Sequence, residues 1–513
     1  MEDMERKFEQ RFARMEAQNA ETAKKIFGIL ESLIQKVNSI EKPPADSAVI
    51  GLGTVTEEKP LGTVTEEKPP SHVGIEANLN GLELTELKKL DVKRRKTISE
   101  LLISTSKAER KETRLKVRQD SLRLGSVDFI SAGTVLSEVW KDGHVFSDLN
   151  AKQEKLQEER EAIEQQLLKI TPSGATRNNF QEQEAVLEQR DRYELEKERL
   201  IREMKRIRDE DGSRFNGFQI LKDRYVLLNL LGKGGYGEVY KAFDLAEHRY
   251  VACKIHGVNV QWSEAIKQNY IKHTNRECRI HKSLVHDHIV RIWEIFLIDK
   301  NTGCSVQEYC MGKDLDALLK ASPILPEREA RVILVQIFHA LVYLNTRTQK
   351  IIHYDLKPGN VLFDEFGVAK LTDFGLSKIV ENDVGSQGME LTSHGAGTYW
   401  YLPPECFDFR KTPLISSKVD VWSAGILFYQ MLFGKRPFGH GQTQESILRE
   451  NTIIEARMVE FPPMPTVSDE AKAFIRRCLT YNQAERPDVL IIAQDPYLTF
   501  VTLSPDQESM LNI

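Results

Sequence analysis

The sequence is poor in cysteine and lacks a long apolar run, and each absence excludes a class of protein. No C-x-x-C pair occurs among the six cysteines, so zinc is not expected, and scattered reduced thiols suit the cytosol or nucleus. No apolar stretch is long enough to span a bilayer, and the start, Met1–Arg6, does not resemble a secretory signal. We therefore expect an intracellular protein without a membrane span. The cysteines are Cys253, Cys278, Cys304, Cys310, Cys406 and Cys478.

A large excess of one charge is also absent. The 513 residues include 71 basic and 76 acidic ones, for a formal net charge of −5. Nucleic acid or an anionic membrane is therefore not expected as the main partner. The length predicts two or more folding units.

Residues 1–42 predict a coiled-coil helix. No proline occurs between Phe8 and Ile40, and apolar residues recur there at four-three spacing with one slip. This pattern is typical of a coiled-coil seam with a stutter. Asn19 takes an a position in this register, where an asparagine can fix helix pairing at a cost in stability. An amphipathic helix packed on its own domain is the alternative.

Residues 43–81 differ in composition and predict a disordered linker. Leu52–Pro60 is a nine-residue unit rich in proline, glycine and glutamate, and Leu61–Pro69 repeats it unchanged. Two copies are too few for a solenoid, and a segment of this composition does not bury a core.

Two charged segments follow the linker. Residues 82–130 are predicted to be partly helical, and their basic cluster Lys88–Lys96 is either a nuclear-import signal or a solvated helix face. Residues 131–211 are predicted to be coiled-coil or helical, because apolar residues fall at every seventh position in two seams. Self-association through these helices is our hypothesis. The seams are Leu149, Leu156, Ile163 and Ile170, and Val186, Tyr193, Leu200 and Ile207.

A globular unit is predicted over residues 225–500, and it opens on a glycine-rich motif. The G-x-G-x-x-G spacing of Gly232–Gly237 lets backbone amides approach phosphates without a Cβ in the way. Rossmann folds show the same spacing, but their turn enters a helix. Here Glu238–Phe243 continues as an alternating strand, and a second strand then delivers Lys254.

The most informative stretch is Ile352–Asn360. It presents a carboxylate, an ammonium two residues later and an amide five residues later, and Asp373–Gly375 then reads Asp-Phe-Gly. This motif order resembles that of protein kinases. The resemblance implies an α+β, bilobal eukaryotic protein-kinase fold, here preceded by coiled-coil helices and a disordered spacer.

Phosphoryl transfer needs a proton acceptor, a cation beside the moving phosphoryl group and oxygen ligands for magnesium. We predict that Asp355 accepts the hydroxyl proton and that Lys357 is the cation. The predicted Mg²⁺ ligands are Asn360 and Asp373. In the kinase pattern, a lysine at this position with Thr398 as its contact indicates a Ser/Thr enzyme. An Asp or Asn in a loop is usually a helix cap or a turn residue. Here several such residues occur together in the order that phosphoryl transfer requires, which favours the catalytic interpretation.

The predicted ATP site joins the glycine motif to Lys254, which needs an acidic partner. Glu277 shares a helical face with apolar residues and would point inward, whereas Glu264 sits in a polar stretch, so we choose Glu277. Glu308–Cys310 is the expected lobe connection, whose backbone binds adenine, and Asp314 is placed for the ribose. The residues assigned to ATP are Leu231, Gly232, Lys233, Gly234, Gly235, Tyr236, Gly237, Val239, Ala252, Lys254, Glu308, Cys310 and Asp314.

Two residues depart from the pattern expected of protein kinases. Tyr354 stands where most have an arginine that binds a phosphorylated activation-segment residue. We hypothesise that activation depends less on such a phosphate and more on assembly or on contacts elsewhere. Gln307 places an amide at the back of the adenine pocket, where it should seek a partner. By resemblance, Glu405 should pair with Arg486, and Asp420 should brace the catalytic loop.

Four motifs are more specific, and they resemble the Tousled-like kinases. The resemblance covers roughly Tyr225–Phe500 and implies a nuclear Ser/Thr kinase that uses ATP and Mg²⁺. It further implies homo-oligomers through coiled coils and protein substrates among histone chaperones of the anti-silencing type. Nucleic acid would then be reached only indirectly, through chromatin. The motifs are His353–Asp355, Gly397–Cys406, Ser417–Gly425 and Phe433–His440.

Other functions are also open to this sequence. A coiled-coil scaffold with a weak or inactive kinase domain is the main alternative, although a scaffold has no chemical need for the complete catalytic set. A nucleic-acid-binding protein that uses the basic cluster is disfavoured by the near-neutral charge. The catalytic set is Lys254, Glu277, Asp355, Asn360 and Asp373.

Overall fold

The computed structural model describes residues 81–132, 135–167, 175–234, 237–259, 261–380, 389–390, 397–407 and 414–499. The predicted coiled-coil helix at 1–42 lies outside these residues, as does the predicted linker with its repeat apart from Gly81. Within the described parts, no helix combines the length and the apolarity that a membrane span requires.

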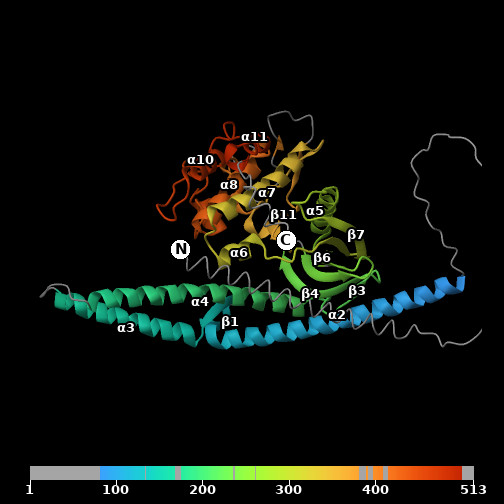
Figure 1. The fold of residues 1–513 in the computed structure, drawn as a ribbon, viewed down its shortest axis with the longest axis horizontal. Helices are drawn as coiled ribbons and strands as arrows, with labels where there is room; N and C mark the ends of the chain where they lie inside the picture. The colour runs from blue at the N-terminus through green and yellow to red at the C-terminus, as the bar shows by residue number, and fades with distance from the viewer. Residues whose placement is uncertain are drawn as a thin grey trace, which may run out of the picture. The chain divides into compact units, whose positions relative to one another are not determined.

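Among the described residues, three long helices and a β-hairpin precede the globular part (Figure 1). The hairpin joins the first helix to the second, and Gly125 at its start has φ +132°. A Cβ on Gly125 would lie 2.2 Å from the carbonyl oxygen of Lys141, so this junction requires glycine. The elements are α2 (Gly81–Leu124), β1 (Gly125–Ala132), β2 (Val135–Asp142), α3 (His144–Leu167) and α4 (Ala175–Asp211).

The hairpin is the main difference from the sequence prediction, which made residues 131–211 a coiled-coil or helical region. The strands β1 and β2 pair antiparallel, from Gly125 opposite Asp142 to Ala132 opposite Val135. The sequence at 126–129 alternates polar and apolar residues, which favours a strand. The charged segment 82–130 is partly helical, as predicted, because α2 ends at Leu124 and β1 begins at Gly125.

The described parts of the two apolar seams predicted in α3 and α4 pack against each other within the chain, whereas Ile170 and the side chain of Ile163 lie outside the described residues. Leu149, Leu156 and Val186 are buried in one cluster, with Tyr193 packed beside them. Leu200 is buried in a second cluster with residues of α2 and α3. These parts of the seams are therefore covered without a second copy of the chain.

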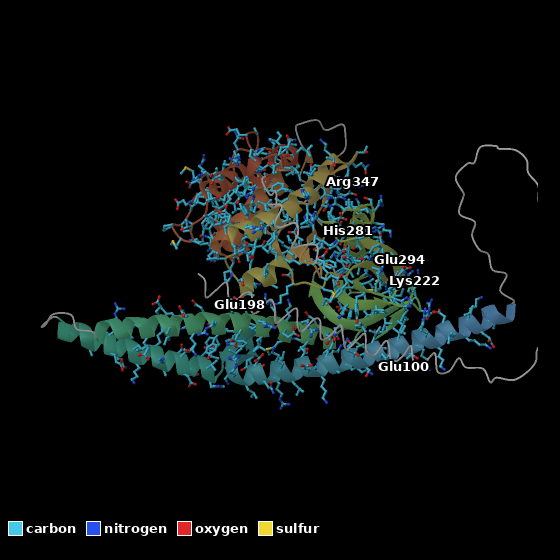
Figure 2. The ribbon with its side chains drawn as sticks, viewed as in Figure 1. Glu100, Glu198, Lys222, His281, Glu294 and Arg347 are labelled. Atoms are coloured by element: carbon cyan, nitrogen blue, oxygen red, sulfur yellow. The ribbon has the colours of Figure 1, made fainter. Side chains whose placement is uncertain are left out.

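A six-stranded antiparallel sheet forms the first lobe of the globular part, in the order β3-β4-β5-β6-β8-β7. Its two edges approach each other, because Lys222 after β3 forms an ion pair with Glu294 on β7 (Figure 2). The hydroxyl of Tyr225 also donates to Glu294, at 2.6 Å. The elements are β3 (Ile220–Leu221), β4 (Tyr225–Gly234), β5 (Gly237–Asp244), β6 (Arg249–Gly257), α5 (Glu264–Lys282), β7 (Ile292–Asp299) and β8 (Thr302–Glu308).

The second lobe is mainly helical and has the larger core, centred on α7 and α8. Nearly all of α8 is buried, including Trp422 and Phe428, as expected of a helix that is apolar on most of its faces. The α-helices are α6 (Leu315–Ala321), α7 (Glu327–Thr346), α8 (Lys418–Phe433), α9 (Gln444–Arg449), α10 (Asp469–Cys478), α11 (Val489–Ile492) and α12 (Pro496–Thr499). The strands are β9 (Lys350–Ile352), β10 (Val361–Phe363), β11 (Ala369–Leu371), β12 (Lys378–Val380), β13 (Met389–Glu390) and β14 (Leu414–Ile415). The 3₁₀ turns are η1 (Pro358–Asn360), η2 (Tyr399–Tyr401) and η3 (Pro404–Phe407).

Candidate active site

The strands β4 and β5 carry the glycine-rich motif and pair as an antiparallel hairpin, with Gly234 opposite Gly237. A Cβ on Gly232 or Gly234 would meet nothing within 4 Å, so the space beside this backbone is open. Gly237 has φ +122°, and a Cβ there would lie 2.1 Å from the carbonyl oxygen of Ile255. Only glycine fits that position. Two residues assigned to ATP, Gly235 and Tyr236, lie outside the described residues.

Lys254 on β6 pairs with the acidic residue chosen for it from the sequence. Its Nζ lies 2.5 Å from Glu277 Oε1 on α5 and 3.3 Å from Asp373 Oδ1. Glu264, the rejected alternative, is 80% exposed at the start of α5 and pairs with Lys267. The hydroxyl of Ser263 caps α5 and accepts the Ile266 N–H, which fixes where the helix starts.

The charges in this cluster shift one another's pKa. Burial alone would lower the pKa of Lys254, but Asp373 and Glu277 outweigh it and hold that pKa above its ordinary value. Burial raises the pKa of Glu277, and Lys254 opposes the rise. Burial also acts to raise the pKa of Asp373, but Lys254 overcomes it and holds the pKa below its usual range. The ammonium is thus held between two carboxylates from separate elements.

Phe374, the residue after Asp373, packs between two buried histidines. Its ring centroid lies 4.7 Å from that of His281 on α5, labelled in Figure 2, and 4.9 Å from that of His353. Burial lowers the pKa of His281 to about 4, so this ring is neutral near pH 7. These ring contacts link α5, the Asp-Phe-Gly turn and the catalytic loop.

The chain leaves β8 through the predicted lobe connection. Glu308 N donates to Arg291 O at 2.8 Å, and the Glu308 carboxylate pairs with Lys370 at 3.0 Å. Burial raises the pKa of the Cys310 thiol to about 12. The buried amide of Gln307 finds the partner it was expected to need, because its Nε2 donates to Ser305 Oγ at 3.1 Å.

The other residues assigned to the nucleotide lie on the same strands or just beyond the connection. Leu231 is exposed on β4, Lys233 pairs with Glu238 across the hairpin at 2.9 Å, and Val239 stands opposite Lys254. Ala252 is half-buried on β6, opposite Gln307. Asp314 has a structural task that the sequence prediction did not include. Its Oδ1 accepts the Ala317 N–H at 2.7 Å and caps α6.

Asp355, Lys357 and Thr398 form a closed triangle. The Thr398 hydroxyl donates to Asp355 Oδ1 at 2.9 Å, and Lys357 Nζ donates to Asp355 Oδ2 at 2.7 Å and to Thr398 Oγ1 at 3.2 Å. Asn360 Nδ2 donates to the backbone oxygen of Asp355 at 2.8 Å. Asn360 Nδ2 also donates to Asp355 Oδ2 at 3.1 Å, so three side chains hold the carboxylate of Asp355.

The scaffold pairs expected behind this triangle are present. The buried Asp420 accepts the His353 N–H at 2.8 Å and the Tyr354 N–H at 2.9 Å, one on each carboxylate oxygen. Arg486 binds Glu405 through two parallel contacts, at 2.8 and 3.2 Å. Such bidentate pairs add geometric specificity as well as energy.

Residues 225–498 match the family described as "Protein kinase domain". The chain belongs to the protein kinase family. It is 66% identical to "Serine/threonine-protein kinase TOUSLED" of Arabidopsis thaliana over 79% of this chain and 63% of that protein. It is 46% identical to "Serine/threonine-protein kinase tousled-like 1" of Homo sapiens, over 78% of this chain and 60% of that protein. The protein of the same name from Caenorhabditis elegans is 39% identical, over 88% and 55%.

These relatives confirm the resemblance to Tousled-like kinases that the motifs indicated. The aligned share of the chain exceeds the kinase domain, so the likeness extends into part of the upstream chain. The chain spans 55–63% of the length of these relatives.

The kinase domain places Tyr354 in an apolar environment. It is 1% exposed, has φ +68°, and lies in a buried cluster with Leu402 and Cys406. Burial raises the pKa of its phenol well above the usual range, so the side chain stays neutral. The position that often carries an arginine in kinases is therefore part of a packed core here.

Two oxygen donors of the kinase domain fit a magnesium site. Thr372 N donates to Asn360 O at 3.0 Å, which brings Asn360 beside the residue that precedes Asp373. The Asn360 amide nitrogen is engaged with Asp355, so its side-chain oxygen is the atom that would bind a metal. No group of three or more His, Cys, Asp or Glu side chains forms a metal site among the described residues. Two hard oxygens fit Mg²⁺, which takes its other ligands from phosphates and water.

Sequence reasoning missed one residue of the site, although a signal for it was present. His281 lies four residues after Glu277, so the two share a face of α5. An inward-facing Glu277 therefore also predicts an inward-facing histidine beside the Asp-Phe-Gly turn.

Proposed function

We propose that the protein is a serine/threonine protein kinase that transfers the γ-phosphate of ATP to hydroxyl groups of proteins. The convergence of Lys254 on β6, Glu277 on α5 and Asp373 in the loop after β11 is the observation that carries this proposal. Glu277 and Asp373 are 23 and 119 positions from Lys254 in the chain. A scaffold protein has no chemical reason to bring them together.

In this proposal, Lys254 contacts the phosphates of ATP. Its ammonium is fixed by two carboxylates, so little order is lost when it binds a third anion. The open space beside Gly232 and Gly234 lets the hairpin backbone approach the phosphates. The backbone of Glu308–Cys310 binds adenine, and the free carboxylate oxygen of Asp314 remains for the ribose, since its Oδ1 caps α6.

Asp355 accepts the proton of the substrate hydroxyl. Its side chain is only 6% exposed, and its position is set by donors from Lys357 and Thr398. Lys357 sits beside the transferred phosphoryl group and offsets its charge. Because Thr398 contacts both residues, the triangle matches the arrangement expected for Ser or Thr as the acceptor.

Asn360 and Asp373 hold the metal. Mg²⁺, when bound, neutralises charge on the phosphates. The lowered pKa of Asp373 keeps its carboxylate ionised at neutral pH, which is the state a ligand needs.

The test compares purified wild-type protein with Asp355→Ala and Glu277→Gln, each incubated with Mg-ATP and a generic basic protein. Asp355→Ala should lose phosphate incorporation by orders of magnitude. Glu277→Gln should lose most of it, because Lys254 is no longer fixed by that carboxylate. Glu264→Gln is the matched control on the same helix and should behave as wild type. Equal incorporation by wild type and Asp355→Ala would contradict the proposal.

The second candidate function is a coiled-coil scaffold with a weak or inactive kinase domain. The long helices α2, α3 and α4, which precede the kinase domain, favour it. The same assay separates the two functions, since a scaffold gives no incorporation that depends on Asp355.

We further propose nuclear localisation and substrates among histone chaperones in chromatin assembly, as the resemblance implies. Exposed lysines of the basic cluster on α2 support an import signal, whereas Arg95 is half-buried and pairs with Asp91. A fluorescent fusion of the full chain should be nuclear, and replacing these lysines by alanine should move it to the cytoplasm. A nuclear signal that survives the replacements would exclude the cluster as the import signal. The exposed lysines are Lys88, Lys89, Lys93 and Lys96.

A further inference from the structure

The strand that leads into the glycine-rich motif is only partly paired within its sheet. The pairing of β4 with β5 shifts register between Leu227 and Leu230, and again between Leu230 and Gly232. Such an irregularity frees backbone groups of the strand, and buried ones need partners elsewhere. Leu228 and Leu230 are both buried.

The missing partners come from the helices before the kinase domain. Arg110 of α2 donates to Leu228 O at 2.5 Å. Arg206 of α4 donates to Leu230 O at 2.9 Å, and Leu230 N donates to Glu210 Oε1 at 2.9 Å. Both backbone groups of Leu230, two residues before Gly232, are thus held by the last two turns of α4. Figure 1 shows α4 and α2 beside β4, and contacts of both helices with this strand agree.

Glu210 is the centre of this contact. Its side chain is fully buried, and arginines from two helices surround it, with Arg110 at 3.2 Å, Arg114 at 3.3 Å and Arg206 at 3.6 Å. A buried charge persists only when it is paired and hydrogen-bonded. The geometry therefore fixes α2 and α4 to each other and to β4 at one point.

The segment after α4 also holds the other strand of the glycine hairpin. The hydroxyl of Ser213 donates to Glu238 Oε2 at 2.5 Å, and the other oxygen of Glu238 pairs with Lys233 at 2.9 Å. Lys233 and Glu238 lie on opposite strands, at positions paired in the sheet. Both arms of the hairpin are therefore connected to the end of α4.

We propose that Glu210, Arg206 and Ser213 are positioning residues of the nucleotide site. They hold the glycine hairpin in the position that binding of the ATP phosphates requires. This inference rests on the proposed kinase function. Its consequence is that the long helices control nucleotide affinity without touching the nucleotide. A brace that only stabilises the fold would not act selectively on nucleotide binding.

The experiment uses the full chain with Arg206→Met and with Ser213→Ala. Arg206→Met removes the donor to Leu230 O and keeps the apolar stem of a half-buried side chain. Arg199→Met is the matched control, because Arg199 is exposed on the same helix and has no described polar partner. Glu210→Gln is not part of the test, because three arginines would lose their charged partner and this loss could prevent folding.

Binding of a non-hydrolysable ATP analogue with Mg²⁺ is measured by calorimetry, beside kcat, KM for ATP and the melting temperature. We expect Arg206→Met and Ser213→Ala to weaken binding and raise KM for ATP by about tenfold each, which corresponds to about 1.4 kcal/mol. At saturating ATP, kcat should stay near wild type, as for a loss of uniform binding. Arg199→Met should match wild type in every measurement.

Two results would overturn the inference. One is wild-type nucleotide affinity in both variants. The other is a parallel fall of affinity, kcat and melting temperature, which indicates a structural brace only. The proposed function fails separately, if the wild-type chain itself binds no nucleotide or binds it without phosphate transfer.

Discussion

At the scale of the residue, the position of Asp355, the proposed proton acceptor, depends on the hydroxyl of Thr398, which contacts both Asp355 and Lys357. Thr398 is the only one of the three that belongs to another part of the chain, between Gly397 and the η2 turn. It orients Asp355 and Lys357 at the same time. A misplacement of a catalytic group by about 1 Å can cost roughly a hundredfold in rate.

Thr398→Val should therefore lower kcat by about tenfold to a hundredfold, because it removes both contacts of the hydroxyl while keeping the shape of the side chain. Thr398→Ser keeps the hydroxyl and should retain most of the activity. Steady-state kinetics on a peptide substrate, with the melting temperature as a check of folding, distinguishes the two. Equal loss in both variants would mean that the methyl group, not the hydroxyl, matters.

His281 makes the stability of the kinase domain sensitive to acid. Its pKa is about 4 in the folded protein, against an unfolded value of about 6.5. Between these values the unfolded chain binds the proton and the folded chain does not, so stability falls as pH falls. The loss is about 1.4 kcal/mol per pH unit in that window, or roughly 3 kcal/mol in all.

His281→Gln keeps an N–H donor and cannot titrate, so its free energy of unfolding should fall less steeply than that of wild type between pH 6.5 and 4. Denaturant unfolding at several pH values measures this slope. His273→Gln, an exposed position of the same helix, is the control and should follow wild type. Parallel profiles for all three proteins would contradict the assignment of the slope to His281.

At the scale of the element, α2 supports the first lobe through a small apolar contact. Ile98, Leu102 and Ile103 pack on a buried cluster formed by Val226, Leu228 and residues near β5. The contact involves β4, the strand that leads into the glycine motif. A helix that is mostly polar thus has one short apolar patch that fixes it to the kinase domain.

Leu102→Ala should weaken this contact by about 1–3 kcal/mol, toward the low end because the side chain is only half-buried. Leu101→Ala is the matched control, since Leu101 is 53% exposed, and it should change stability by less than about 0.5 kcal/mol. Hydrogen exchange of the β4 amides reports the effect locally. Faster exchange in Leu101→Ala than in Leu102→Ala would reverse the assignment.

The sequence was most informative where chemistry restricts residue type. Glu277 could be chosen over Glu264 because one lies on an apolar face and the other does not. Gly237 could be assigned because its motif admits no side chain. The hairpin at 125–142 was not predicted, since its alternation is short beside the heptad seams. The contact of Glu210 with β4 was also out of reach, because no local pattern tells which strand a buried acid will meet.

At the scale of the whole molecule, self-association through a coiled coil requires an apolar seam that the chain does not already bury within itself. Leu149, Leu156 and Val186 are already covered within the chain. A coiled coil between copies therefore needs another seam. The seam predicted in residues 1–42 is the one that the sequence still offers.

We accordingly expect the full chain to form a dimer or a larger homo-oligomer, and the chain without residues 1–42 to be a monomer. The second half of that seam is Leu30, Leu33, Val37 and Ile40. Leu33→Glu with Val37→Glu places charges at two of these positions and should have the same effect as the deletion, because a buried unpaired charge opposes association. Gln35→Glu, off the seam, should leave the oligomer intact. Equilibrium sedimentation of the four proteins decides. A monomeric full chain would contradict the hypothesis of self-association. An oligomer that survives the deletion would indicate that the interface lies on α3 and α4 instead.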